Sequence, residues 1–272
     1  MSMSPLASAQ SRTARCTAAA EVTGEVKQVP MTDRVVTQPA PPSPGPLQKL
    51  GGWVRDYAYV TYWWLRAFFD RSSPERYLHP ANGPKVPILI VPGVYENWRF
   101  MQPVAEHLFR AGHPVHVLDK LGFNTGTVPA MAEIVREYLQ QLDLTDVVVV
   151  AHSKGGLIAK YALAEEETLR RVRRLIAINT PFAGSRYAYL FLLHSLRMFT
   201  PTGPMIRALQ TRLEVNRTIS SLYSVFDPHI PETSRLEGAE NIVLPSIGHF
   251  RPLADPHTLG LIDAIINREL EP

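Results

Sequence analysis

Short apolar runs alternate with longer amphipathic stretches from residue 86 to the end of the chain. Continuous apolar runs are typical of strands buried on both faces of a parallel sheet, and amphipathic stretches are typical of the helices that cover such a sheet. The pattern predicts six strands, over residues 86–91, 115–118, 147–151, 175–178, 222–226 and 242–244. It predicts helices over about residues 99–111, 127–142, 154–166 and 256–270. We therefore expect an α/β fold, with a mostly parallel sheet of about six strands and helices on both faces.

Two segments depart from this alternation. Residues 182–219 form a long excursion with an apolar opening, and excursions of this length inside a domain are usually lids or binding elements, so we expect a helical cap. Residues 53–69 are strongly aromatic but too short and too charged to cross a membrane. We expect a helix packed over the domain edge. An interfacial helix lying on lipid is the alternative, which we favour less because the charges are few and not gathered on a cationic face.

The first 48 residues are rich in Ser, Ala, Thr, Gln and Pro and lack apolar periodicity. Such a segment buries too little surface to offset its ordering entropy, so we expect a disordered leader before one domain over residues 49–272. Five prolines fall near its end, at Pro39, Pro41, Pro42, Pro44 and Pro46. Arg12 and Arg15, without an acid among the first twenty residues, leave open an organelle transit peptide or a mis-assigned start upstream of Met31.

Composition narrows the classes of partner. The net charge is +3, the charges of both signs are interspersed, and no Lys/Arg block occurs, which argues against a nucleic-acid partner. A single cysteine, Cys16, excludes an internal disulfide and an all-cysteine zinc site. Without a bilayer-length apolar run or a secretory signal, we expect a cytoplasmic protein, with peripheral membrane contact through residues 53–69 as an open alternative. The pattern specifies no oligomeric state.

A serine occupies the corner between the third apolar run and the helix that follows, in the stretch Ala151-His-Ser-Lys-Gly155. Such a corner holds the Ser153 hydroxyl above the sheet in a strained conformation, and small residues at positions 151 and 155 relieve the crowding. The helix beginning at Lys154 directs N–H groups and its positive end to the same point. An ordinary turn with a capping serine is the alternative, but we favour a nucleophile.

A nucleophilic hydroxyl needs a base, and the base needs a group that orients it. Asp227 ends the fifth apolar run, at the sheet edge where α/β proteins place their sites, and His249 follows the last run beside a glycine. The order Ser153, Asp227, His249 is the one expected when an elbow serine precedes its acid and its base. Chain order favours this pair over four rivals, which are His229 and His257 as base and Asp119 and Asp255 as acid. His152 adjoins the nucleophile and would be misdirected as a base.

The first apolar run ends in Val91-Pro-Gly-Val94. A glycine-containing turn after this strand can direct a backbone N–H toward the serine. We assign the N–H of Val94, together with that of Lys154, to the stabilisation of a negative oxygen. A plain loop before a helix is the alternative at this position.

Four stretches, in order, resemble an α/β hydrolase of the lipase and esterase type, and together they span about residues 86–270. They are Val91-Pro-Gly-Val-Tyr95, Ala151-His-Ser-Lys-Gly-Gly156, Asn179-Thr-Pro-Phe-Ala-Gly-Ser185, and Asp227 followed by Gly248-His249. The sequence departs from the family pattern twice. Ala151 replaces the usual first glycine of the elbow, as in small bacterial lipases with an Ala-His-Ser core, and Pro92 stands where a histidine is common.

This resemblance implies a sheet without the family's first two strands, a cap over the site, and ester hydrolysis through an acyl-enzyme on Ser153 with no metal or organic cofactor. It implies that His249 acts as the base and that Asp227 orients it. Apolar side chains suggest a pocket for the acyl chain of a lipid or small ester, although they serve equally well as cap core; they are Tyr95, Trp98, Phe182 and Phe191. Thioesterase, amidase and cofactor-free peroxidase activities remain alternatives on the same residues, as do a non-catalytic ligand-binding protein and a membrane-associated scaffold.

Overall fold

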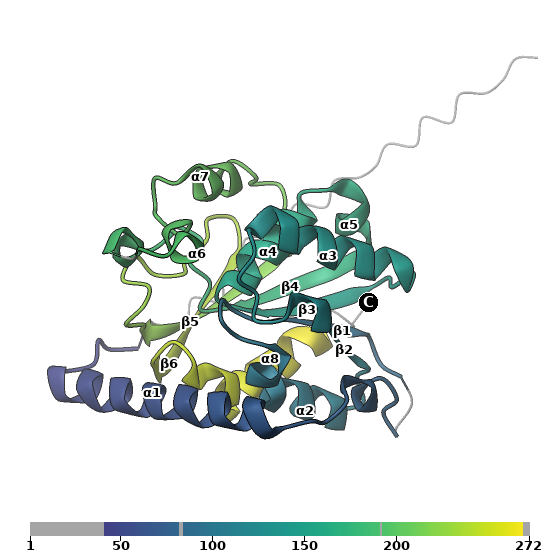
Figure 1. The fold of residues 1–272 in the computed structure, drawn as a ribbon, viewed down its shortest axis with the longest axis horizontal. Coiled ribbons are helices and arrows are strands. Elements are labelled where there is room, and N and C mark those ends of the chain that lie inside the picture. The colour runs from purple at the N-terminus through teal and green to yellow at the C-terminus, as the bar shows by residue number, and fades with distance from the viewer. Residues whose placement is uncertain (1–40, 82–83, 191, 269–272) are drawn as a thin grey trace, which may run out of the picture. The chain divides into compact units, whose positions relative to one another are not determined.

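A six-stranded parallel sheet forms the centre of the computed structural model, which describes residues 41–81, 84–190 and 192–268 (Figure 1). Its strand order is β2-β1-β3-β4-β5-β6. The strands are β1 (Ile88–Val91), β2 (Val115–Val117), β3 (Val147–His152), β4 (Val172–Ile178), β5 (Ile219–Phe226) and β6 (Glu240–Ile247). All five neighbouring pairs run parallel, which confirms the predicted fold class.

Strand bounds differ from the predicted runs where polar residues or proline occur. The first strand begins at Ile88 rather than at residue 86, because Pro87 has no N–H to give to the ladder. Strands β4, β5 and β6 begin two or three residues earlier than predicted, since their first residues include charged or hydroxyl side chains that apolar patterning does not detect.

Helices cover both faces of the sheet (Figure 1). The predicted helices appear as α2 (Gln102–Arg110), α3 (Val128–Gln141), α4 (Lys154–Leu163) and α8 (Pro256–Arg268), and α5 (Glu166–Arg171) is a further short helix that was not predicted. Helix α4 ends three residues before the predicted boundary, and Glu165, which is extended with φ −92° and ψ 129°, separates it from α5. Short 3₁₀ turns are η1 (Pro74–Tyr77), η2 (Trp98–Met101), η3 (Asp119–Leu121), η5 (Asn216–Thr218) and η6 (Arg251–Ala254).

Alternate residues of the central strands face two separate cores. Leu89 and Val149 pack with α3 and α4 on one face, whereas Ile90 and Val150 pack with α2 and α8 on the other. Because every residue of β1 and β3 is buried, these strands read as unbroken apolar runs in the sequence.

The segment that was predicted to be a cap contains η4 (Arg186–Leu190), α6 (His194–Arg197) and α7 (Pro204–Gln210). Ile206 and Leu209 of α7 belong to the core on the α3 and α4 face.

Helix α1 (Pro46–Phe69) lies on the other face with α2 and α8 (Figure 1). It begins inside the segment expected to be a disordered leader; residues 1–40 of that segment lie outside the described residues, so the leader stays a prediction. No helix in the described part of the chain has the length and apolar character needed to cross a membrane.

Candidate active site

Ser153 occupies a strained corner between β3 and α4. Its backbone has φ 50° and ψ −121°, a region that non-glycine residues rarely adopt. The corner lies very close to β1, because a Cβ built on Gly155 would be 2.1 Å from the carbonyl oxygen of Val91. The next residue, Gly156, is similarly confined, since its Cβ would be 2.0 Å from the Thr180 hydroxyl. The two glycines therefore allow the tight approach that positions the serine.

A chain of hydrogen bonds joins Ser153, His249 and Asp227. The distance from Ser153 Oγ to His249 Nε2 is 2.9 Å, and the distance from His249 Nδ1 to Asp227 Oδ2 is 2.7 Å. The three residues follow β3, β6 and β5, so they meet at the carboxyl edge of the parallel sheet. Since an ionised carboxylate only accepts, Nδ1 carries the proton and Nε2 is left to accept from the serine hydroxyl.

Asp227 and His249 are both buried, and each shifts the pKa of the other toward its charged form. Burial alone would raise the pKa of Asp227, but the charge and hydrogen bond of His249, followed by the backbone N–H of His229, outweigh it and lower the pKa. Burial alone would lower the pKa of His249, but the charge and hydrogen bond of Asp227 outweigh it and raise the pKa. The imidazole therefore binds a proton more strongly than an ordinary histidine, as suits a group that removes a hydroxyl proton.

Of the four rivals for the base and the acid, only His229 lies beside His249. Their rings are tilted against each other, with centroids 5.0 Å apart, and burial followed by the positive charge of His249 lowers the pKa of His229 to about 4. Asp255 accepts hydrogen bonds from Thr258 at the start of α8, and His257 lies in the first turn of that helix. Asp119 begins the turn η3.

The backbone around His249 is held by Asp56, which sequence reasoning missed. The carboxylate of Asp56, which has no exposed surface, accepts the backbone N–H groups of His249, Phe250 and Arg251 at 2.8, 2.8 and 2.9 Å. On the other side, the Asn179 amide donates to the His249 carbonyl oxygen at 2.8 Å. The imidazole loop is therefore fixed from α1 and from the end of β4 at once.

A second buried histidine and carboxylate lie beside the first pair. His152 Nδ1 is 2.8 Å from Glu96 Oε1, and His152 Nε2 donates to the His249 carbonyl oxygen at 3.0 Å. Glu96 also accepts the backbone N–H of Gly93 at 2.8 Å. These contacts join the turn after β1 to the loop after β6. Nothing in the sequence pattern indicated this link, although both residues stand in or beside the stretches that suggested the site.

The backbone N–H groups of Val94 and Lys154 were predicted to stabilise a negative oxygen. In residues 41–81, 84–190 and 192–268, neither the N–H of Val94 nor that of Lys154 has a hydrogen-bond acceptor, whereas the N–H of Gly93 is taken by Glu96. The Lys154 side chain is buried and donates to the carbonyl oxygens of Asn124 and Gly126. Burial lowers the pKa of this lysine to about 8. The side chain of Lys154 thus anchors a loop, while its N–H stays free.

The residues expected to contact an acyl chain are dispersed. The Tyr95 hydroxyl is 2.7 Å from the Ser195 hydroxyl in the cap segment. Trp98 is almost fully buried in the core beside α2, edge-on to Tyr77, and Phe182 is buried in the core beside α4. Phe191 lies outside the described residues. Burial alone accounts for the apolar character of Trp98 and Phe182, and their contact with a substrate stays a prediction.

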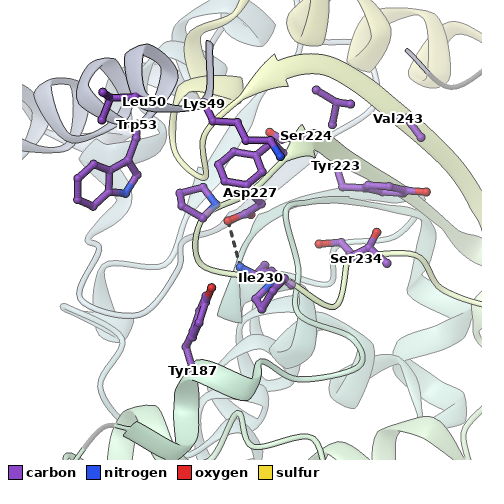
Figure 2. Close-up of a pocket in the computed structure, with 15 residues that line it drawn as sticks. Lys49, Leu50, Trp53, Tyr187, Tyr223, Ser224, Asp227, Ile230, Ser234 and Val243 are labelled. Carbon is purple, nitrogen blue, oxygen red and sulfur yellow. Dashed lines mark hydrogen bonds between the residues drawn. The ribbon is translucent and has the colours of Figure 1, made fainter. Parts of the chain in front are cut away.

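A pocket of about 580 Å³ borders Asp227 between α1 and the ends of β5 and β6 (Figure 2). Figure 2 shows Leu50 and Trp53 of α1 on one side of it and Tyr187 on another. Neither Ser153 nor His249 lines this pocket, so it is distinct from the space above the serine. Among the described residues, no group of three His, Cys, Asp or Glu side chains is arranged to hold a metal ion.

Comparison with known proteins supports the fold. Residues 86–203 match the model of a family described as the alpha/beta hydrolase fold. No curated protein matches the sequence.

Solved structures with the same fold cover most of the chain at low identity. The Bacillus licheniformis lipase BlEst2 in its mature form is 17% identical, covers 69% of this chain and 94% of its own, and has a TM-score of 0.55. MGS-MChE2 is an alpha/beta hydrolase enzyme from the metagenome of lagoon sediments at Mar Chica, Morocco. It is 15% identical, covers 70% of this chain and 94% of its own, and has a TM-score of 0.52. A hydrolase from Oleispira antarctica is 16% identical, covers 72% of this chain and 98% of its own, and has a TM-score of 0.50. At these identities the likeness concerns the fold.

Proposed function

We propose that this chain, whose residues 86–203 match the family model of the alpha/beta hydrolase fold, is a serine hydrolase that cleaves carboxylic esters through an acyl-enzyme on Ser153. The observation that carries the proposal is the hydrogen-bonded chain from Ser153 through His249 to Asp227, with distances of 2.9 and 2.7 Å. A serine on a strained elbow, a histidine with Nε2 free to accept, and a buried carboxylate are the three parts that nucleophilic catalysis by a hydroxyl requires.

In the first half of the reaction, Ser153 Oγ forms a bond to the acyl carbon while His249 Nε2 takes the hydroxyl proton. The resulting imidazolium is stabilised by the Asp227 carboxylate on Nδ1. When the tetrahedral intermediate collapses, the bond to the leaving alcohol breaks and His249 returns the proton to that alcohol. Water then repeats the sequence on the acyl-enzyme, which releases the acid and restores the serine.

The negative oxygen of the tetrahedral intermediate needs donors that are already in place. The free N–H groups of Val94 and Lys154 supply them, and the second lies at the N-terminus of α4, where the helix dipole adds positive potential. Losing one such donor typically costs roughly 3 to 4 kcal/mol of transition-state stabilisation. Glu96 keeps the Gly93 N–H occupied, so the turn after β1 is fixed without consuming the N–H of Val94.

For the substrate we favour lipids or esters of medium chain length. Apolar residues of the cap segment are exposed at Tyr187, Tyr189 and Leu190, close in sequence to Ser195, whose hydroxyl meets that of Tyr95 near the turn after β1. Short-chain esters, thioesters and amides are cleaved by the same chemistry, so only a substrate panel separates these classes.

Chromogenic esters of increasing acyl length test the proposal with the wild type and Ser153→Ala. We expect the substitution to lower activity by at least ~10³-fold across every ester that the wild type cleaves. Ser43→Ala, which changes an exposed serine ahead of α1, is the matched control and should behave as the wild type. Equal activity of the wild type and Ser153→Ala, or silence of the wild type toward every ester, thioester and amide tried, would contradict a hydrolase and favour a ligand-binding protein.

A further inference from the structure

Helix α1 is fixed to the domain by one of its faces. Gly52 lies directly against the Ile247 side chain of β6, where a Cβ would approach to 2.2 Å. Asp56 is fully buried and holds the loop of His249, and Tyr59 packs against the core beside α2 and α8. These residues recur at intervals of three or four, so they occupy a single side of the helix.

The opposite face of α1 is apolar and open. Leucine, phenylalanine, tryptophan and tyrosine side chains on it are between 42% and 84% exposed. The centre of this face carries Leu47, Leu50, Val54, Leu65 and Phe68, and Thr61, whose hydroxyl donates to the Tyr57 carbonyl oxygen, lies between Val54 and Leu65. Its margins carry further exposed rings, at Trp53, Tyr57, Tyr62, Trp64 and Phe69. A helix that only covers a domain edge should present mainly polar residues on this side, and a predominantly apolar face instead marks a docking surface.

The exposed charges of α1 are all positive. Arg55 and Arg66 are eleven residues apart, which at about 100° per residue places both on the same flank of the apolar face. Lys49 lies over the Phe226 ring at 5.0 Å and is half-buried. The only acid in the helix, Asp56, faces inward and is committed to three backbone N–H groups. The docking surface is therefore apolar and aromatic, with cations along one margin.

We propose that the outer face of α1 binds the surface of a lipid bilayer that contains anionic phospholipid, with the helix lying in the plane of the membrane. Tryptophan and tyrosine favour the boundary between acyl chains and headgroups, because each has an apolar ring and a polar tip. Arginines at the margin of an amphipathic helix reach anionic headgroups while their stems lie along apolar surface. This binding goes beyond ester hydrolysis and does not depend on it.

A second copy of the chain fits the same surface less well. Two copies joined along antiparallel α1 helices would bring the arginines of both helices to one margin, and in either orientation the helix exposes no acid to neutralise them. An anionic bilayer pairs with the same arginines favourably and accepts a convex helix without a complementary groove.

Vesicle flotation of the full chain tests the proposal. We expect binding to vesicles of phosphatidylcholine and phosphatidylglycerol, and weaker binding to phosphatidylcholine alone or at high salt. Leu65→Ser with Phe68→Ser should lower the partition coefficient at least ~10-fold, because two apolar side chains no longer enter the membrane. Arg55→Gln should lower binding to anionic vesicles roughly fivefold and leave binding to neutral vesicles unchanged.

The matched control is Phe123→Ser with Leu142→Ser, which removes the same two residue types at exposed positions outside α1 and should bind as the wild type. Circular dichroism establishes that every variant is folded. Absence of flotation, or equal loss in the control, would overturn the proposal, and so would a dimer in solution that Leu65→Ser with Phe68→Ser converts to a monomer. Ser153→Ala should float as the wild type, so a failure of binding is distinguishable from a failure of the hydrolase assignment.

Discussion

The carboxylate of Asp56 accepts the backbone N–H of His249 at 2.8 Å, although the two residues are 193 positions apart. Gly248 makes this approach possible, since it has φ 122° and a Cβ there would be 2.4 Å from Asp56 Oδ1. The helix with the exposed apolar face thus holds, by its other face, the loop of His249. We propose that Asp56 is a positioning residue, which acts on the proposed reaction through His249.

We expect Asp56→Asn to lower kcat roughly 10- to 100-fold with a smaller change in KM, because an amide would turn a donor toward backbone donors and loosen the loop. The pKa of His249 offers a readout beyond stability. Burial lowers that pKa and Asp227 raises it, and the negative charge of Asp56 raises it further. Removing this charge should move the acid limb of the kcat/KM profile to lower pH.

Measured profiles of the wild type, Asp56→Asn and Glu166→Gln give the comparison. Glu166 is an exposed acid on α5, so its neutralisation should leave the acid limb in place. A loss of activity in Asp56→Asn without any displacement of the limb would mean that Asp56 serves only the stability of the fold.

The raised pKa of His249 also determines how activity depends on pH in the wild type. The base works only when its imidazole is neutral, and a raised pKa keeps it protonated to higher pH. Activity should therefore fall as the pH is lowered through a midpoint above about 6.5, the ordinary value for histidine. Asp227→Asn removes the largest raising influence, so the midpoint should move to lower pH while kcat falls by about 10⁴-fold.

Two measurements check this dependence. The pH profile of kcat/KM gives the wild-type midpoint, and NMR titration of the imidazole in folded Ser153→Ala and in Asp227→Asn gives the pKa without turnover. A wild-type midpoint below 6.5, or the same imidazole pKa with and without Asp227, would contradict the assignment of His249 as the base.

Short sequence patterns were enough to predict the sheet and the position of the corner at Ser153. Buried parallel strands produce unbroken apolar runs, and the corner at Ser153 has a short signature of small residues, so the sheet and the strained corner could be predicted. Asp227 and His249 followed from chain order, because each comes directly after a strand of that sheet. Every one of these inferences uses residues that are close to a strand end in the sequence.

The groups that hold the site could not be predicted in the same way. Asp56 looked like one of the charges that interrupt an aromatic segment, and only the packing of α1 against β6 brings it to the loop of His249. His152 was set apart from the role of base because it adjoins Ser153 in the sequence, but its bond to the His249 carbonyl depends on a contact across 97 residues. Such tertiary contacts leave no periodic trace in the sequence.

The pair of His152 and Glu96 should tolerate the loss of charge but not the loss of hydrogen bonding. In Glu96→Gln, the amide oxygen can accept from Gly93 N–H while the amide nitrogen donates to His152 Nδ1. Glu96→Leu leaves the Gly93 N–H and a buried imidazole nitrogen without partners. We expect Glu96→Leu to lower the free energy of unfolding by about 3 kcal/mol and Glu96→Gln by less than about 1 kcal/mol.

Urea denaturation of the two variants separates these effects, and His152→Leu in combination with Glu96→Leu measures the coupling between the two side chains. Because the double variant removes both partners, it should be less destabilised than the sum of the single variants. Equal destabilisation by Glu96→Gln and Glu96→Leu would show that charge rather than hydrogen bonding maintains the pair.

Glycine at position 155 should be required for the corner itself. Alanine normally stabilises a helix by up to about 1 kcal/mol relative to glycine. At Gly155, however, the added Cβ would be 2.1 Å from the Val91 carbonyl oxygen, which belongs to a strand backbone buried in the sheet and cannot rotate away. We expect Gly155→Ala to lower the free energy of unfolding by roughly 2 kcal/mol, and to reduce kcat because Ser153 shifts away from the turn after β1.

Gly260→Ala is the matched control, since Gly260 lies in α8 and a Cβ added there would meet no atom within 4 Å. At this position the higher helix propensity of alanine is not opposed by a steric clash, so the substitution should raise the free energy of unfolding by about 0.5 to 1 kcal/mol. Urea denaturation and ester turnover of both variants test the comparison. If Gly155→Ala were as stable and as active as Gly260→Ala, the close packing of the elbow against β1 would have no part in positioning the serine.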